Sequence, residues 1–314
     1  MDRYEQLNIP FGTAICYSGY RDGQSPDTQT YPSYEQVKED LLILQDRWKY
    51  LRVYDCSLHA ERVLEVIQNE KLDFQVMLGA YIAAEESNPN CPWGGMHSAE
   101  KLAENRVNNL EEIQRLIRLA NQYPDIAFAL SVGNEATVEW TDHLVPVERV
   151  VEYASMVKAG AKQPVTFCEN YVPWHTKLAP LAEVVDFISI HTYPVWEYKN
   201  IEEALDYTKE NFLGVAQRYP DTPVMITEAG WTTNTNGRGI NLDNVSEELQ
   251  EIYYHDLLQW SKKEGIITFL FEAFDETWKG SPDAMEPEKH WGIFKVDRTP
   301  KKVMIPYYPQ LQPD

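Results

Sequence analysis

Short runs of β-branched and aromatic residues alternate along the chain with longer segments in which apolar residues recur every three or four positions. The short runs are typical of strands buried on both faces, and the longer segments are typical of helices with one buried face. Eight strand-like runs are present. They span 11–18, 50–56, 74–82, 126–135, 164–170, 184–194, 223–231 and 265–276.

The segments between these runs carry apolar stripes at helical spacing. One stripe consists of Val37, Leu41, Leu44 and Trp48. Regular alternation of eight strands with helices predicts an α/β fold, a single-domain (β/α)8 TIM barrel covering 1–314. The other stripes are formed by Leu110, Ile113, Leu116, Ile117 and Ala120, by Ile201, Ala204, Leu205, Thr208, Phe212 and Val215, and by Leu249, Ile252, Tyr253, Leu257 and Trp260.

A doubly wound open sheet is the competing architecture, and it usually carries a glycine-rich phosphate turn after its first strand. Here the first run leads into CYSGYRDG, which lacks the GxGxxG spacing, and no GxxxxGK[ST] motif occurs in the sequence. Six prolines after the eighth run leave little room for a long final helix. We therefore expect an irregular C-terminal tail from about residue 277.

The chain of 314 residues has 49 acidic and 28 basic residues, a formal net charge of −21. This balance argues against a nucleic-acid partner or an anionic membrane surface, because both require a basic face. No apolar run is long enough to span a bilayer, and the first ten residues contain no signal region. We favour a secreted or periplasmic protein whose signal peptide has been removed, and we expect a monomer.

The four cysteines are far apart, without the close pairs that zinc sites and redox motifs use. We expect buried free thiols, with a disulfide between Cys16 and Cys56 as the alternative. The seven histidines are scattered, and the acidic stretch 22–27 lacks the EF-hand spacing. We therefore expect no metal and no other cofactor.

Candidate chemistry lies at strand ends, because active sites of this barrel class are built at the carboxyl ends of the strands. Glu135 and Glu228 each follow an apolar run, where a carboxylate is costly unless it is paired or faces a cleft. The fourth and seventh strands lie on opposite sides of the barrel mouth, so the two carboxylates can face each other. A separation of about 5 to 5.5 Å suits a retaining glycosidase, and a wider gap suits an inverting one.

Four motifs together resemble glycoside hydrolase family 17, of bacterial type. They are GNE at 133–135, TEAGW at 227–231, FEAFDETWK at 271–279 and KHWGIF at 289–294. That family contains β-1,3-glucanases and glucanosyltransferases, in a barrel clan that places its acid/base on strand four and its nucleophile on strand seven. The resemblance extends from the first strand to about residue 296.

The resemblance implies that Glu135 is the general acid/base and Glu228 the nucleophile. It also implies that Glu276 and Lys279 line the cleft and support the acid/base. Clustering of several glutamates in one pocket agrees with this, since like charges at short range cannot all ionise.

Four further residues are candidates for supporting roles at these strand ends. Asn134 is a partner for the substrate 2-hydroxyl, or else a turn residue after glycine. Tyr193 is placed to hold the nucleophile by a hydrogen bond, with His191 beside it or serving as a core histidine. Arg52 is placed to reach a carboxylate from the second strand, or to form a structural ion pair.

Of the 38 aromatic residues, 28 are Tyr or Trp. Such rings suit sugars, which present apolar C–H faces and hydroxyl groups. The candidate platforms at strand ends are Tyr17, Tyr54, Tyr171, Trp174 and Trp231.

The predicted function is retaining hydrolysis of laminarin-type β-1,3-glucan or its oligosaccharides. The long loops at 17–32 and 83–98 favour exo attack with release of glucose, because extra loops at a barrel mouth can block one end of a groove. Endo cleavage and glucanosyl transfer are the alternatives within the same chemistry. A non-catalytic glucan-binding barrel is the alternative of another class.

Overall fold

The computed structural model describes residues 3–312. Eight parallel strands pair in sequence order, and β1 pairs with β8, so the sheet closes into a barrel. The predicted (β/α)8 barrel is confirmed. The strands are β1 (Ala14–Cys16), β2 (Tyr50–Arg52), β3 (Gln75–Ala80), β4 (Ala127–Asn134), β5 (Val165–Asn170), β6 (Ile188–His191), β7 (Val224–Ala229) and β8 (Thr268–Leu270).

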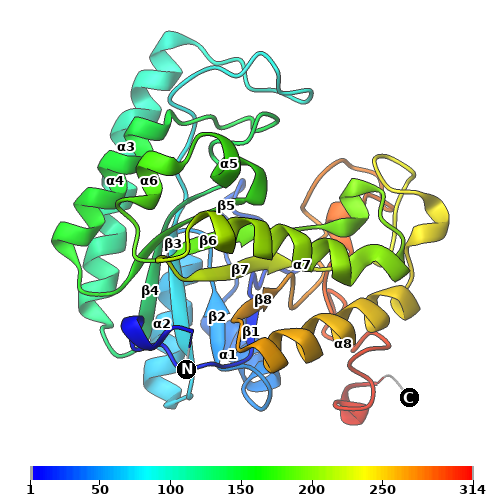
Figure 1. The fold of residues 1–314 in the computed structure, drawn as a ribbon. Coiled ribbons are helices and arrows are strands. Elements are labelled where there is room, and N and C mark those ends of the chain that lie inside the picture. The colour runs from blue at the N-terminus through cyan, green and yellow to red at the C-terminus, as the bar shows by residue number, and fades with distance from the viewer. Residues whose placement is uncertain (1–2, 313–314) are drawn as a thin grey trace.

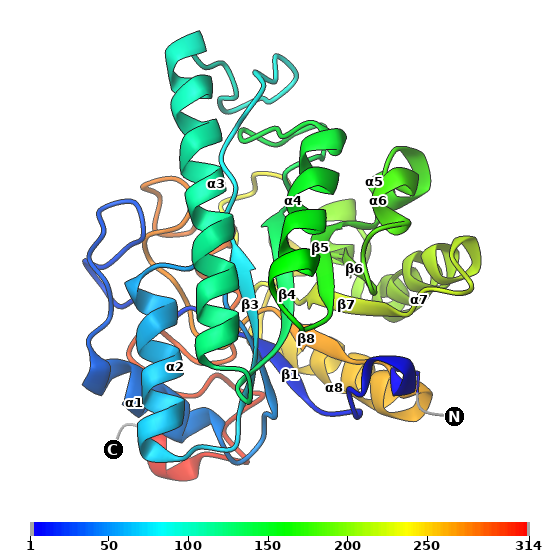
Figure 2. The same cartoon turned by 90° about the vertical axis from the view of Figure 1, so that its left-hand side faces the viewer.

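In the part of the chain that the structure describes, eight α-helices lie outside the barrel (Figure 1). Figure 2 shows α2, α3 and α4 side by side over the outer face of β3 and β4. The helices are α1 (Tyr34–Leu44), α2 (Leu58–Glu70), α3 (Ala99–Gln122), α4 (Val147–Gly160), α5 (Tyr171–Thr176), α6 (Ala179–Ala182), α7 (Ile201–Arg218) and α8 (Glu247–Glu264). Most of the apolar stripe residues face the barrel, as in α1, where Val37, Leu41 and Leu44 are buried. Ile252 is an exception, because it lies on the outer face of α8 and is exposed.

Helix starts follow local capping chemistry. Ser33 accepts a hydrogen bond from the backbone of Gln36, whose side chain reaches back to the Ser33 N–H, so α1 begins with a capping box. Ser98 and Ser246 cap α3 and α8 in a similar way through their hydroxyl groups. These caps determine the residue at which each of these helices begins after the preceding loop.

The observed strands lie within the predicted runs but are shorter, because ladder hydrogen bonds rather than apolar character define their ends. Phe11 precedes β1 and is exposed. Residues 271–276 stay buried beyond the end of β8, yet their backbone bonds mainly to neighbouring loops. After β8 the described chain, up to residue 312, contains only the short 3-10 helices Pro287–Lys289 and Pro309–Leu311.

The barrel interior is densely packed and includes a few satisfied polar groups. For example, the Thr166 hydroxyl donates to the Phe187 carbonyl and lies 2.9 Å from the Ser189 hydroxyl. All four cysteines are free and buried, which confirms the expected thiols and rules out the Cys16–Cys56 disulfide. None of the helices within residues 3–312 is long and apolar enough to cross a membrane.

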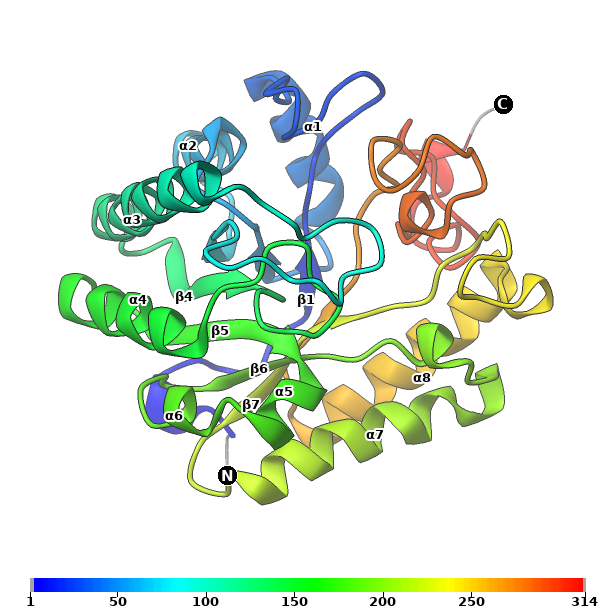
Figure 3. The ribbon, with the colours of Figure 1, turned by 90° about the horizontal axis from the view of Figure 1, so that it is seen from above.

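The connections from strand to helix gather at one end of the barrel, the end where the strands terminate. Figure 3 looks onto this end and shows the segment between β3 and α3 crossing above it. The opposite end carries the short returns from helix to strand. The polar residues at strand ends therefore share one mouth.

Candidate active site

Glu135 follows the last residue of β4 in an unusual backbone conformation. Its φ is +47°, and Gly133 two residues earlier has φ of +90°. A Cβ on Gly133 would lie 2.8 Å from Ile82 and 3.0 Å from Phe167, so only glycine fits there. The Glu135 N–H still donates to the Cys168 carbonyl at 2.9 Å. The strand is thus turned sharply while it stays anchored to β5, and the Glu135 side chain is 27% exposed.

Glu228 lies within β7 and is nearly buried, with a hydrogen-bond donor on each oxygen. One oxygen accepts from Arg52 at 2.5 Å and from the Tyr54 hydroxyl at 3.0 Å. The other accepts from the Tyr193 hydroxyl at 2.5 Å. Burial would raise the pKa of Glu228, but the charges of His191 and Arg52 and the bonds from Tyr193 and Arg52 outweigh it and hold the pKa below its ordinary value. Glu228 is therefore an ionised carboxylate at neutral pH.

His191 joins the two carboxylates. Its Nδ1 lies 2.8 Å from a Glu135 oxygen and 3.3 Å from a Glu228 oxygen. Burial would lower the pKa of His191, but the charge of Glu228, together with hydrogen bonds to Cys168 and Glu135, raises it to about 10. The imidazole is thus a buried cation at neutral pH, and its position limits how far apart the two carboxylates can be.

Arg52 provides a second buried cation. Its guanidinium donates from Nη1 to Glu228 and from Nη2 to the Asn134 side-chain oxygen at 2.5 Å. This fork fixes the Asn134 amide, so that its carbonyl side faces Arg52 and its NH₂ group remains a donor. Arg52 thus forms an ion pair with Glu228 and also contacts Asn134, the residue that precedes Glu135.

A second group of charges lies beside the carboxylates. The Lys279 ammonium is 3.0 Å from both oxygens of Glu272 and 2.5 Å from Glu276. Burial raises the pKa of Glu272 well above its ordinary value. Burial opposes ionisation of Glu276 as well, but the charge of Lys279 and bonds from Lys279, Ser18 and Trp278 hold its pKa low. Glu276 is fully buried, so Lys279 rather than Glu276 forms the partly exposed edge of this group.

Two further glutamates, the buried Glu169 and the half-buried Glu288, belong to the site although the sequence did not single them out. The pKa of Glu288 is raised to about 7, mainly by burial and also by the charges of Glu135 and Glu228. The charge of Lys279 opposes this shift. Glu169 on β5 accepts from the Thr137 N–H and hydroxyl and from the Asn170 N–H. A signal for Glu288 exists, since it directly precedes the KHWGIF motif. The sequence contains no comparable signal for Glu169, because the segment VTFCEN has the pattern of an ordinary buried strand.

The predicted aromatic platforms divide into two groups. Tyr54 is half-buried, and its hydroxyl donates to Glu228 at 3.0 Å. Tyr171 is half-buried on α5, where its hydroxyl lies 2.8 Å from that of Tyr207. The prediction is wrong for three further rings, which protein atoms cover on both faces. These are Tyr17, bonded to Asp40, Trp174, bonded to the Ser189 carbonyl, and Trp231, bonded to the Asn244 carbonyl.

Glu135, His191 and Glu228 also bring three ligand atoms within 4.8 Å of one another, a spacing that suits a metal ion. The donor chemistry does not fit one. His191 retains a proton at neutral pH and would have to lose it to bind a metal. The Arg52 cation already lies 2.5 Å from Glu228. These two protein cations supply the positive charge that a metal would bring.

The protein-family model named BtgE/BtgC glycoside hydrolase domain matches residues 14–292 of this chain, a range that includes every strand of the barrel. The chain belongs to this family. The resemblance to glycoside hydrolase family 17 is thereby confirmed, and solved structures agree with it. The fold matches an endo-laminarinase from Formosa Hel1_33_131 with a TM-score of 0.81 and 28% identity, covering 95% of this chain and 86% of that one.

Three other similarities place the family in context. A family 17 β-1,3-glucanosyltransferase from Rhizomucor miehei shares the fold with a TM-score of 0.70 at 22% identity, covering 92% of this chain and 95% of that one. A glucan 1,3-beta-glucosidase of Arthroderma benhamiae is 30% identical over 194 residues, 56% of this chain and 61% of that protein. A probable glucan endo-1,3-beta-glucosidase btgC of Aspergillus clavatus is 24% identical over 293 residues, 85% of this chain and 39% of that protein. The chain thus spans less than two thirds of these curated relatives.

The His191 cation should control the acidic limb of the pH profile. Replacing His191 with Gln removes the largest favourable charge acting on Glu228, so the pKa of Glu228 rises and the acidic limb of kcat/KM moves to higher pH. Activity at pH 5 should therefore fall more than activity at pH 7. Tyr193→Phe removes a neutral donor from the same carboxylate and should move the limb less. A profile that is scaled down without a change of shape would contradict this role.

Glu169 should make the folded protein less stable as pH rises. Burial and the neighbouring Glu135 raise its pKa from 4.5 to about 7, so the folded state binds the extra proton between these pH values. The free energy of unfolding should fall across this window by roughly 3 kcal/mol on account of Glu169. Urea unfolding of Glu169→Gln at pH 5 and pH 8 should show a weaker pH dependence than wild type. Glu111→Gln, an exposed change on α3, is the control, and identical pH dependence in all three proteins would exclude the effect.

Proposed function

We propose that the protein is a retaining glycoside hydrolase that acts on β-1,3-glucan and releases glucose from chain ends. The observation that carries this proposal is the separation of the two carboxylates. Oxygens of Glu135 and Glu228 lie within 4.8 Å of each other. Retaining enzymes hold their two carboxyl groups about 5 to 5.5 Å apart, whereas inverting enzymes need about 6.5 to 9.5 Å to fit a water.

In the first half-reaction the ionised Glu228 attacks the anomeric carbon, while Glu135 gives its proton to the departing glycosidic oxygen. The bond from the anomeric carbon to that oxygen breaks as the glycosyl–Glu228 ester forms. In the second half-reaction Glu135 takes a proton from water, and the resulting hydroxide displaces Glu228 from the anomeric carbon. Two inversions leave the product with the configuration of the substrate.

The surrounding residues prepare this chemistry. Arg52, Tyr54 and Tyr193 fix the Glu228 oxygens by hydrogen bonds and keep the carboxylate ionised. The Asn134 NH₂ group, oriented by Arg52, is available to the sugar 2-hydroxyl. That contact strengthens as the oxocarbenium-like transition state develops.

Attack at chain ends is supported by the segments 17–32 and 83–98, which add bulk at the mouth where a long groove would have to run. The relative from Arthroderma benhamiae carries the name glucan 1,3-beta-glucosidase, which agrees with release of single units. Endo cleavage is the second candidate, and it is favoured by the likeness to the endo-laminarinase from Formosa.

A time course of products separates these possibilities. Linear β-1,3-glucan and its short oligomers are incubated with the enzyme, with β-1,4-glucan and β-mannan as controls, and the products are resolved by chromatography. Glucose alone from the earliest times is the expected result, whereas an early ladder of oligomers would establish endo cleavage. Products longer than the substrate would establish glucanosyl transfer. Inactivity on every glucan, together with binding, would favour a sugar-binding barrel.

A further inference from the structure

Two loops from opposite sides of the barrel make contact above the mouth. Trp93 lies on the segment between β3 and α3, and Arg238 on the segment between β7 and α8. The Arg238 guanidinium carbon is 6.0 Å from the centre of the Trp93 ring. In the closed barrel β3 and β7 are separated by three strands in either direction, so the contact spans the mouth. In Figure 3 the β3–α3 segment crosses above the barrel towards the β7–α8 side.

The Trp93 side of this contact is held firmly. The Asn88 N–H donates to the Gly95 carbonyl at 2.6 Å, which closes residues 88–95 into a turn with Trp93 near its tip. The Asn88 side chain donates to the carbonyls of Glu139 and Thr141 at 2.8 and 2.7 Å, so this turn is fastened to the loop after β4. Despite these anchors the Trp93 side chain is 56% exposed. The ring of Trp93 is therefore presented to solvent on an anchored turn, where it is available for contact with the opposite loop.

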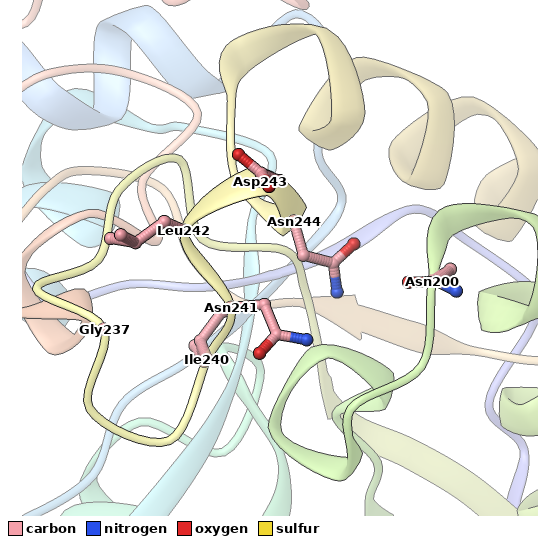
Figure 4. Close-up of a pocket in the computed structure, with 7 residues that line it drawn as sticks. All are labelled: Asn200, Gly237, Ile240, Asn241, Leu242, Asp243 and Asn244. Carbon is pink, nitrogen blue, oxygen red and sulfur yellow. The ribbon is translucent and has the colours of Figure 1, made fainter.

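The Arg238 side of the contact lies on a turn bounded by two glycines. Arg238 stands between Gly237 and Gly239, whose φ angles are +86° and +76°. Glycine adopts such angles without steric cost, and the N–H groups of Gly237 and Arg238 donate to the side chains of Thr235 and Asn236. The backbone of this turn is therefore held, and the exposed Arg238 side chain is the part that can change direction. Its nearest carboxylate, on Glu286, is 3.9 Å away, a weak ion pair. The loop also borders an open cavity of about 590 Å³ that is lined by Gly237, Ile240 and Leu242 on this loop and by Asn200 across from them (Figure 4).

We propose that Trp93 and Arg238 form a clasp, a cross-mouth contact that restricts how a glucan chain enters the active site. The proposal rests on the proposed function. A chain end can slide beneath the closed clasp, whereas the middle of a long chain can reach Glu135 and Glu228 only when the clasp parts. Because an exposed cation–π contact is weak, the clasp slows entry from the side without forbidding it. Trp93 and Arg238 are thus specificity-determining residues that favour chain ends.

Single substitutions test the clasp. For Trp93→Ala and Arg238→Ala we measure the viscosity loss of a long soluble β-1,3-glucan, divided by the number of reducing ends released. Each substitution should raise this ratio by about two- to fivefold, because an exposed cation–π contact contributes about that factor. Hydrolysis of laminaritriose should change little, because a trisaccharide need not enter from the side. Met96→Ala is the matched control, since Met96 is a 70% exposed apolar residue near Trp93 on the same segment.

A covalent lock tests the opposite direction. In Trp93→Cys/Arg238→Cys, a short bifunctional methanethiosulfonate reagent can bridge the two introduced thiols, while the native cysteines are buried. Bridging should abolish viscosity loss of the long glucan, leave laminaritriose hydrolysis intact, and be reversed by dithiothreitol.

Three outcomes would overturn the proposal or the function beneath it, and they are distinguishable. An unchanged ratio of viscosity loss to reducing ends in both alanine variants would overturn the clasp. Weaker hydrolysis of longer oligomers with an unchanged ratio would also overturn it and make Trp93 a sugar platform. If wild-type protein cleaves no β-1,3-glucan, the proposed function itself fails.

Discussion

Glu228→Gln is expected to lower kcat on β-1,3-glucan by about 10⁴-fold, because the amide cannot form the glycosyl ester on which the double displacement depends. The substitution also places an NH₂ group against donors, since Arg52, Tyr54 and Tyr193 all donate to the Glu228 oxygens. The variant should still bind β-1,3-glucan, because Glu228 acts as the nucleophile and contributes little to the area of contact with the sugar. Steady-state kinetics measure the loss, and calorimetry with laminari-oligosaccharides measures the binding.

The identity of the nucleophile can be established independently of any lost activity. A 2-deoxy-2-fluoro glucoside with a good leaving group should inactivate wild-type protein by accumulating the glycosyl ester, and peptide mass spectrometry should locate the added mass on Glu228. Glu111→Gln, on the exposed face of α3, should keep full activity and label normally. Near-full activity of Glu228→Gln, or a label on another residue, would refute the mechanism.

Glu135→Ala is expected to reduce hydrolysis of β-1,3-glucan by about 10³-fold, within the range that proton transfer contributes. The reason is that the glycosidic oxygen of a glucan is a poor leaving group unless it is protonated. With a dinitrophenyl β-glucoside the first half-reaction needs no acid, so bond cleavage should be nearly normal and deglycosylation should limit the rate. Pre-steady-state kinetics should then show a burst of dinitrophenol.

Added azide provides a sharper form of this experiment. The missing side chain leaves room beside the ester, and azide needs no general base, so it should accelerate turnover of Glu135→Ala and yield a β-glucosyl azide. A β product also reports retention of configuration. Azide should have no such effect on wild type or on Glu228→Gln. Equal losses on glucan and on the activated glucoside would contradict an acid/base role for Glu135.

The sequence by itself determined the barrel and the two carboxylates. A parallel barrel buries each strand on both faces, so its eight strands stand out as apolar runs separated by helical stripes. Glu135 and Glu228 stand out for the same reason, because a carboxylate after such a run needs a partner or a cleft. Their positions on strands four and seven place them across one mouth in any barrel of this order.

Only the tertiary structure decided what surrounds these carboxylates. His191 reads equally well as a core histidine or a site residue, and its role depends on a 2.8 Å contact with Glu135, which lies 56 residues away. Glu288 and Glu169 acquire their raised pKa values from burial and from charges on other elements. Tyr17, Trp174 and Trp231 have the composition of sugar platforms, yet packing covers them. The sequence shows which residues follow each strand. Whether their side chains are buried, and which side chains they contact across the barrel, depends on how the eight loops pack together in the folded protein.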